Sequence, residues 1–481
     1  MQLQHSQGAN LGQDKISRLL FQLALPAILA QLINLLYNMV DRMYIGHIPD
    51  VGPNALTGVG VTLPLIMCIS AFAALVSMGG APRASIMMGK GEPQQAERIL
   101  GNCASMLVIT ALVLTVVIQC FGQDILMIFG ASSNTISYAW DYMKIYSLGT
   151  LFVQLALGLN AFINAQGFAR TGMLTVTIGA ACNIILDPIF IFALGMGVQG
   201  AALATILSQG ISCAWILRFL TGKTTTLRLQ LRYARLRGSV ILPCIALGIA
   251  PFIMQFTESI LNICFNTSLL RYGGDIAVGA MTILASVMQF CMLPLQGLTQ
   301  GAQPIIGFNF GANQRDRVKE AFRLLLACCM VFAGLIWFLS MFVPQLFISI
   351  FTSDPQLADF TRWAIRIYMA VSLLHGIQIS CQQTFIALGN AKTSVFLALL
   401  RKVILLIPLI YISHISWPTR CLPCFWPNLW PISSPSAPQP PSSTDSTKSY
   451  KNLLKPSASD RSVPGRAVFP LTNGTRRGIV F

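Results

Sequence analysis

Charged side chains are scarce in this sequence. Only 10% of its 481 residues are charged and 16 are acidic, whereas 54% are hydrophobic. A water-soluble protein of this length needs many more charged residues to cover its surface. The composition therefore excludes a soluble two-domain protein and predicts an all-α protein with many transmembrane helices.

Motifs that mark catalytic or metal sites are also missing. The sequence contains no HExxH motif, no serine–histidine arrangement and no pair of catalytic aspartate motifs. Its 13 cysteines are scattered through apolar segments, a pattern typical of small buried hydrophobic residues and not of a disulfide framework. We therefore expect a protein that is not an enzyme, with no catalytic residue, no cofactor and no resident metal ion.

Basic residues outnumber acidic ones, 32 to 16, which gives a net charge of +16. They fall in short connections between apolar runs, a distribution that is typical of cytoplasmic loops and disfavours nucleic-acid binding. We interpret the longest connection as a linker that sets membrane topology, and binding of anionic lipid is the alternative. This connection contains Lys223, Arg228, Arg232, Arg235 and Arg237.

Eleven apolar runs are close to the roughly 20 residues that a membrane-spanning helix needs. The first run follows Lys15 and Arg18 and is too long for the core of a signal peptide. The alternation of basic connections places the N-terminus in the cytoplasm. The runs cover 19–44, 54–80, 99–120, 138–162, 172–194, 198–219, 240–269, 277–303, 321–343, 363–386 and 394–413.

The two halves of the chain repeat each other at an offset of 222 residues. Each repeat starts on the cytoplasmic side and contains an even number of spans, so the two halves are parallel, as in transporters with a cavity between two lobes. A duplicated channel is the alternative. The best match aligns Ala165, Gly167, Ala169, Arg170 and Thr171 with Ala387, Gly389, Ala391, Lys392 and Thr393.

From the repeat we expect five regions. They are a cytoplasmic N-terminal tail (1–14), an N-terminal lobe with the first six spans (15–220), the basic linker (221–239), a C-terminal lobe with spans seven to eleven (240–413) and a tail rich in proline and serine (414–481).

One carboxylate lies inside an otherwise apolar span. Asp187 precedes Pro188 within the run from Met173 to Phe192, and Asn183 lies four residues earlier on the same helix face. Pro188 has no N–H to donate to the carbonyl of Ile184. An ionisable residue within a membrane span is typical of an ion or proton pathway. An interfacial or helix-pairing aspartate is the alternative.

Two further polar residues lie at compatible depths in the membrane. At 1.5 Å per residue, Asp187 lies about 21 Å along its run and Asp41 about 33 Å along the first span, both in the outer half. Thr205 lies about 10 Å into the sixth span. Pro26 provides a place for the first span to bend. For Asp41, a surface ion pair with Arg42 is the alternative.

Several short motifs occur together between roughly residues 15 and 412. They are Ala24-Leu25-Pro26, Val40-Asp41-Arg42, Gly79-Gly80-Ala81-Pro82-Arg83, Asn183 through Pro188, Gly200 through Thr205, and Gln300-Gly301-Ala302-Gln303-Pro304. In combination they resemble the multidrug and toxin extrusion (MATE) family, and most of all its bacterial MepA-type branch.

The resemblance implies two parallel six-helix lobes and a secondary antiporter. Such a protein exports cationic or amphiphilic drugs or toxins by alternating access, in exchange for protons or sodium ions. We expect it as a multi-pass monomer in the lipid of a bacterial-type inner (plasma) membrane. Carried over by position, Asp41, Asn183, Asp187 and Thr205 would form the cation-coupling site, with Pro26 and Pro188 as hinges. A low dielectric favours the neutral form of a carboxylate, which suits a proton, while the oxygens of the site equally suit sodium.

The coupling site is not duplicated in the second half. At a slightly larger offset, Asn266 aligns with Asp41. Glu258 is a candidate partner for cationic substrate, and an interhelical hydrogen-bonding residue is the alternative. Met288, Gln289 and Met292 are further candidates for a substrate pocket because thioethers adapt to varied ligands, although such residues also face lipid or other helices.

The tail does not fit the repeat, which predicts a twelfth helix near 420–441. Trp417-Pro418, Trp426-Pro427 and Trp430-Pro431 precede a segment rich in serine and proline, and no membrane helix fits there. We therefore expect the last helix to be missing or replaced by a disordered tail. A reading-frame change explains this tail, and a genuinely divergent C-terminus is the alternative. The tail thus makes an inactive frameshifted remnant of a MATE transporter one rival function. A lipid-linked-precursor flippase is the other rival, because related folds move lipid headgroups between leaflets.

Overall fold

The computed structural model describes residues 9–49, 51–351, 354–370 and 372–399, and for residues 53, 256, 258–279, 282, 394 and 397–399 it describes the backbone only. The chain divides into two units, Met1–Trp430 and Pro431–Phe481, and every described residue belongs to the first. The predicted tail at 414–481 and most of the eleventh predicted span lie outside the described residues.

The described residues form helices and no β-strand, which confirms the predicted all-α fold. Seven helices are long and apolar enough to cross a membrane, and two bent helix pairs raise this number to nine within the described residues. The first ten predicted spans all fall on helical segments, and the eleventh begins within α13. In chain order the elements are α1 (Ile16–Gly46), α2 (Gly52–Gly89), α3 (Pro93–Ile128), α4 (Ile136–Leu148), α5 (Thr150–Ala165), α6 (Ala169–Pro188), η1 (Ile189–Ala193), α7 (Gly197–Thr221), η2 (Leu231–Tyr233), α8 (Gly238–Gly311), α9 (Arg315–Phe342), α10 (Gln345–Phe351), α11 (Pro355–Met369), α12 (Ser372–Ala387) and α13 (Ala391–Leu399).

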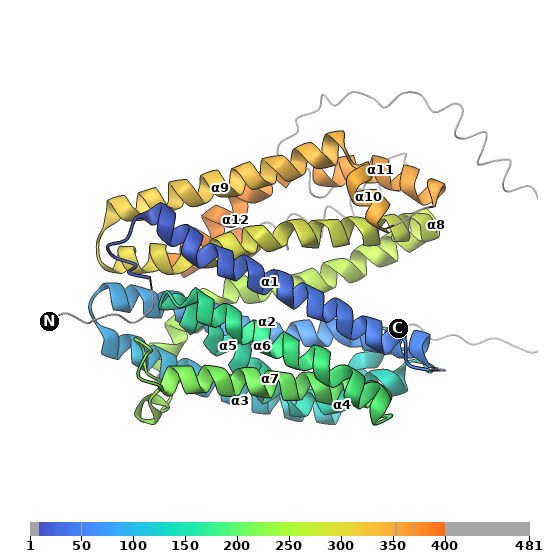
Figure 1. Cartoon of the computed structure of the whole chain (residues 1–481), viewed down its shortest axis with the longest axis horizontal. Helices are drawn as coiled ribbons and strands as arrows, with labels where there is room; N and C mark the ends of the chain where they lie inside the picture. The colour runs from blue at the N-terminus through green and yellow to red at the C-terminus, as the bar shows by residue number, and fades with distance from the viewer. Residues whose placement is uncertain (1–8, 50, 352–353, 371, 400–481) are drawn as a thin grey trace, which may run out of the picture. The chain divides into compact units, whose positions relative to one another are not determined.

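Helix α8 contains two predicted spans. The connection between these two predicted spans falls at 270–276, and the backbone of α8 is helical through it, over 74 residues in all. A straight helix of this length would extend over about 111 Å. Yet both ends of α8 pack tightly on α2: Gly79 leaves no space for a Cβ against the carbonyl of Cys244, and Gly89 leaves none against Phe308. These contacts lie only about 15 Å apart along α2. Helix α8 therefore turns back on itself, as two spans require (Figure 1).

Two predicted spans are bent. The fourth consists of α4 and α5, whose axes differ by 60°, and the tenth consists of α11 and α12, whose axes differ by 41°. The first bend lies at Gly149, where a Cβ would lie within 2.6 Å of the Ile206 side chain on α7. The bend thus lets α4 and α5 pack around α7.

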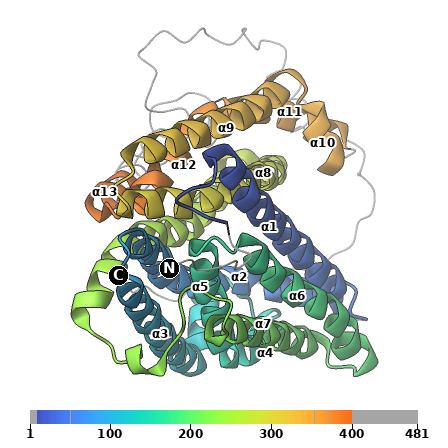
Figure 2. The same cartoon turned by 60° about the vertical axis from the view of Figure 1, so that its left-hand side comes forward.

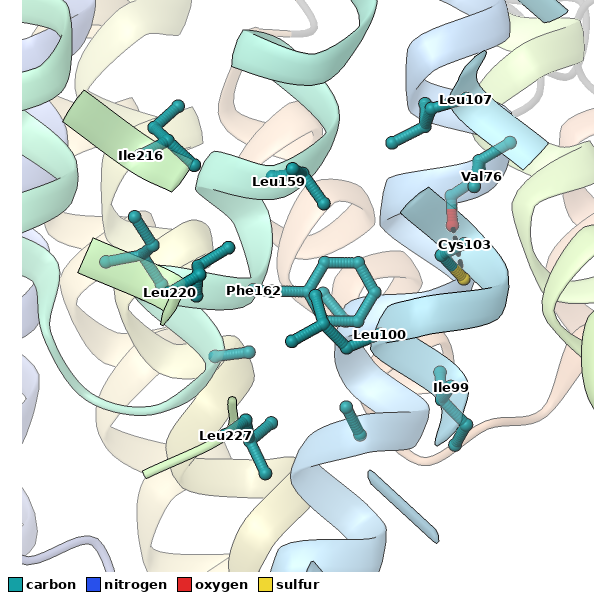
Figure 3. Close-up of a cluster of buried hydrophobic side chains, with 14 of the residues drawn as sticks. Val76, Ile99, Leu100, Cys103, Leu107, Leu159, Phe162, Ile216, Leu220 and Leu227 are labelled. Atoms are coloured by element: carbon teal, nitrogen blue, oxygen red, sulfur yellow. Dashed lines mark hydrogen bonds between the residues drawn. The ribbon is translucent and has the colours of Figure 1, made fainter. Parts of the chain in front are cut away.

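The core of the N-terminal half centres on Phe162 of α5. This side chain is fully buried, and Figure 3 shows its ring beside Leu100 of α3, with Leu159 and Leu220 nearby. Gly80 of α2 completes the packing, because a Cβ there would lie 2.8 Å from the Phe162 ring. Large apolar side chains and small residues therefore join α2, α3, α5 and α7.

Helix α1 lies between the other helices of the N-terminal half and the helices of the C-terminal half (Figures 1 and 2). Its first turns share a buried cluster with α8, which includes Leu19, Leu23 and Ile305. Gly301 of α8 packs directly on the backbone of Ala24. The second half of α1 carries Asp41 and lies along α6. A change in α1 therefore affects contacts with both halves.

Residues 9–14, here called the N-terminal strap, connect the same two halves. The carbonyl oxygen of Leu11 accepts hydrogen bonds from Asn309 Nδ2 at 2.9 Å and from Arg317 Nη2 at 3.2 Å. Arg317 also donates to the carbonyl of Asp14 at 2.7 Å. On its other side the strap passes Gly167, at the turn between α5 and α6, where a Cβ would lie 3.2 Å from the carbonyl oxygen of Ala9.

Candidate functional site

Three helices bring together the four residues that we predicted as a cation-coupling site. Asp41 comes from α1, Asn183 and Asp187 from the last two turns of α6, and Thr205 from α7. Asp187 is 0% exposed and Asn183 is 2% exposed, whereas Asp41 and Thr205 are half-buried. The residues therefore form one cluster at the junction of α1, α6 and α7.

Hydrogen bonds fix the orientation of the α6 side chains. Asn183 Nδ2 donates to Asp187 Oδ1 at 3.1 Å, across one helical turn, and also lies 3.5 Å from Thr205 Oγ1. Thr205 Oγ1 in turn donates to the carbonyl of Ala201 at 3.0 Å. Because the amide group donates to the carboxylate, its own oxygen, Asn183 Oδ1, stays free as an acceptor.

The carboxyl groups of Asp41 and Asp187 are close enough to interact directly. One oxygen of each group, Asp41 Oδ1 and Asp187 Oδ2, is buried and accepts no hydrogen bond. Buried polar atoms are normally paired, and two carboxylates that lie together in a low dielectric repel each other when both are ionised. The pair therefore presents two buried carboxylate oxygens that no donor satisfies.

Sequence reasoning missed two tyrosines that complete this cluster. Tyr37 lies near both Asp41 and Asp187, and Tyr142 of α4 lies near Asp41 and Thr205. The ring of Tyr142 stacks on that of Tyr146, with 5.8 Å between the centroids. In the sequence these tyrosines look like ordinary apolar positions, and only their hydroxyl groups distinguish them from phenylalanine.

A cavity of about 90 Å³ opens beside Asn183 and Thr205. Such a volume accommodates several water molecules. Its lining combines Tyr37 with polar side chains from α5, α6 and α7, among them Asn160, Thr175, Ser208, Gln209 and Ser212, and it contains no lysine, arginine or carboxylate. Asn160 Oδ1 and Ser208 Oγ are buried there without a partner. The cavity therefore offers neutral oxygen atoms next to the carboxylate pair.

Helix α6 ends at Pro188, as the missing N–H of proline predicts, and the chain continues directly into another helical turn. Residues Ile189–Ala193 form a turn of π-helix, in which Leu194 N–H donates to the carbonyl of Ile189 at 2.9 Å. Short π-helices are frequent at functional sites. Pro26 lies inside the continuous helix α1, next to the tight contact of Ala24 with α8.

Met288, Gln289 and Met292, three of the candidate substrate residues, do not line this cavity. Met288 packs on the buried cluster of α8 and α11, Met292 packs on the cluster that joins α1 and α8, and Gln289 is exposed. The side chains of Glu258 and Asn266 lie outside the described part of the structure.

Comparison with known proteins places this arrangement in a family. The MatE family model matches residues 26–189 and 251–412 of the chain. The multidrug export protein MepA of Staphylococcus haemolyticus is 25% identical over 402 residues, which cover 84% of this chain and 88% of that protein. The corresponding MepA protein of Staphylococcus aureus strain N315 is 23% identical over the same length.

Solved structures have the same fold. The MATE multidrug transporter DinF-BH is 32% identical and superposes with a TM-score of 0.81, covering 88% of this chain and 95% of that one. A MATE protein in a bent conformation gives a TM-score of 0.81 at 21% identity, covering 88% of this chain and 94% of that one. These matches confirm the resemblance seen in the motifs, and the chain belongs to the MatE family of multidrug efflux transporters.

Proposed function

We propose that this protein is a secondary antiporter that exports cationic or amphiphilic compounds in exchange for protons or sodium ions. It does so by alternating access, as a monomer in a bacterial-type plasma membrane, with its N-terminus in the cytoplasm. Asp41, Asn183, Asp187 and Thr205 form the cation-coupling site, and Pro26 and Pro188 are its hinges.

The carboxylate pair carries this proposal. Asp41 and Asp187 come from different helices, interact directly, and each has one buried oxygen without a hydrogen bond. A proton or a sodium ion bound there removes the repulsion between them. Asn183 Oδ1 and Thr205 Oγ1 are neutral oxygen ligands of the kind that a hard cation such as sodium prefers. The site therefore supports coupling to either ion.

Cation binding at Asp41 has a route to the rest of the protein through α1. The pair joins α1 to α6, while the first half of α1 packs on α8. When a cation neutralises the pair, the electrostatic repulsion between α1 and α6 is removed. Helix α1 can then bend near Pro26. A bend there moves α1 against α8, which alters the access to the space between the two halves.

The relatives support the class of substrate. MepA is named a multidrug export protein, and DinF-BH is named a multidrug transporter. A flippase for lipid-linked precursors is less well supported, because a path for anionic headgroups needs cationic side chains and the cavity lining beside Asn183 contains none.

Efflux from vesicles tests the proposal. We expect the full chain, reconstituted in proteoliposomes, to move a fluorescent cationic dye against its gradient when a proton or sodium gradient is imposed. Asp187→Asn keeps the size of the side chain but cannot ionise, so we expect it to lose gradient-driven efflux. Asp124→Asn is the matched control, since Asp124 is exposed near the end of α3.

Two results contradict the proposal. Undiminished efflux by Asp187→Asn rules out this carboxylate as a coupling residue. The second result is that the unaltered chain gives no efflux under either gradient, although a thermal unfolding transition shows that it is folded. This result identifies an inactive remnant.

A further inference from the structure

The basic linker between α7 and α8 is a folded part of the N-terminal half. Glu97 of α3 accepts hydrogen bonds from the backbone N–H of Arg228 at 3.1 Å and from Gln230 Nε2 at 2.9 Å. Asn102 Oδ1 accepts from the N–H of Arg237 at 2.7 Å, while its Nδ2 donates to the carbonyl of Tyr233 at 3.1 Å. The turn at η2 is therefore held against α3 along its length (Figure 2).

Two arginine side chains lie against the aromatic ring of Tyr233 in this turn. The guanidinium groups of Arg98 and Arg232 lie 5.8 Å and 4.5 Å from the centre of the Tyr233 ring. Gly101 of α3 allows the close approach, because a Cβ there would lie 2.7 Å from the Cβ of Tyr233. Cation–π contacts of this kind orient arginine side chains without neutralising their charge.

The side chains that the turn presents outward are basic or apolar. Arg228, Arg232, Arg235 and Arg237 are exposed, and neither of the two ion pairs in the described part of the chain involves them. Leu231 is 93% exposed. An exposed leucine in a short segment with four arginines is a combination typical of segments that lie at a membrane surface.

The turn contacts α3 at the level where the apolar run of this helix begins, which is the level of the membrane surface. Ser105 Oγ donates to the carbonyl of Ala234 at 2.6 Å, and Ser105 lies about 18 Å from the start of α3. The last charged residue before the apolar run of α3 is Arg98. The turn therefore lies beside the beginning of the membrane span and not beyond the end of the helix.

From these observations we propose that the turn 228–237 is a binding site for anionic phospholipid of the cytoplasmic leaflet. The four arginines contact the headgroup phosphates, and Leu231 enters the acyl-chain boundary beside α3. Each basic side chain near such a surface adds to the attraction of anionic lipid. The site is separate from the cation-coupling cluster, so its existence does not depend on the transported substrate.

Native mass spectrometry of the purified full chain tests this site. Dioleoyl-phosphatidylglycerol is titrated into the detergent-solubilised protein, with dioleoyl-phosphatidylcholine as the neutral lipid. We expect phosphatidylglycerol to be retained preferentially. We expect at least about tenfold weaker retention when Arg228, Arg232, Arg235 and Arg237 are all changed to glutamine. Leu231→Ser, which leaves the charge unchanged, is expected to weaken retention as well.

A variant with the same loss of charge is the control. It changes four other exposed basic residues to glutamine, namely Lys90, Arg315, Lys319 and Arg323. We expect this variant to retain phosphatidylglycerol like the unaltered protein. The proposal is overturned if the arginine variant retains the lipid normally while its thermal transition is unchanged, or if both charge variants lose it equally. Displacement of the lipid by millimolar inorganic phosphate also overturns it, because the ligand is then a free anion.

Discussion

At the scale of single residues, one buried amide holds the linker to the N-terminal half. Gln166 Oε1 accepts three hydrogen bonds of 2.8–2.9 Å, from Thr225 Oγ1 and from the N–H groups of Thr226 and Leu227. Its Nε2 donates to the carbonyl of Phe162, the centre of the buried cluster in Figure 3. One side chain therefore links the core of this half to the connection between the two halves.

We predict that Gln166→Leu lowers the free energy of unfolding by roughly 1–3 kcal/mol, because the N–H of Leu227 is left buried without an acceptor. The melting temperature of the purified protein measures this loss. Gln94→Leu is the control, since Gln94 is exposed at the start of α3. Equal melting temperatures for the two variants would show that the three hydrogen bonds do not stabilise the protein.

The residues of the candidate site differ in how far the sequence reveals them. Asp41 and Asp187 are conspicuous because charge inside an apolar run is costly, and counting residues along each span placed both in the outer half of the membrane. Tyr37 and Tyr142 gave no such signal, since tyrosine is common in apolar helices. Their part in the cluster depends on helix rotation and on the packing of α4 against α7, which residue counting does not determine.

At the scale of elements, the junction of α6 and η1 joins the site to the chain that follows. Pro188 removes one helical hydrogen bond, and the next turn widens to a π-helix. Gly200, at the start of α7, packs directly on the backbone of Phe190 and Ile191 in that wide turn. The junction therefore connects Asp187 to the helix that carries Thr205.

We predict that Pro188→Ala lowers gradient-driven efflux severalfold while the protein remains folded. The new N–H at position 188 can donate to the carbonyl of Ile184, so the end of α6 becomes more regular and Asp187 loses freedom to move. Efflux from proteoliposomes and the thermal transition are measured together. Pro64→Ala, inside α2, is the control. If the two variants transport equally well, the proline at the site has no special role.

The positions of the spans followed from the sequence, but their bends did not. Ten predicted apolar runs coincide with helices because the length and hydropathy of a span depend on the membrane alone. The 60° bend at Gly149 depends on a contact with Ile206 of a different helix. The helical backbone of α8 between its two spans likewise has no local signal, since residues 269–277 contain two glycines and an aspartate, which are poor helix formers.

At the scale of the whole molecule, the N-terminal strap and α1 both cross between the halves. Arg317 donates three hydrogen bonds: to Asn309 Oδ1 at 2.8 Å and to the carbonyl oxygens of Leu11 and Asp14. The repeat predicted two similar lobes, but at its offset of 222 the strap aligns with residues 231–236 of the linker, which differ from it at every position. The repeat therefore contained no information about these connections. Contacts that break the symmetry of the repeat were therefore not predictable.

We predict that Arg317→Gln releases the strap and accelerates trypsin cleavage after Lys15, which is exposed at the end of the strap. Cleavage requires local unfolding of the backbone, and the strap loses its charged hydrogen bonds in this variant. A time course of digestion, followed by mass spectrometry, measures the rate. Arg315→Gln, two residues away and exposed, controls for the loss of charge. Identical rates for the two variants would show that Arg317 does not hold the strap.

The strap also has a consequence for biogenesis. Leu11 is synthesised long before its hydrogen-bond partner Asn309, which lies 298 residues later in the chain. At roughly 5–20 residues per second, translation needs on the order of 15–60 s to supply that partner. During this interval the eight predicted spans between Leu11 and Asn309 are synthesised, while the strap has no place to dock. Closure of the strap is therefore a late event, and it can occur only after α8 has been inserted.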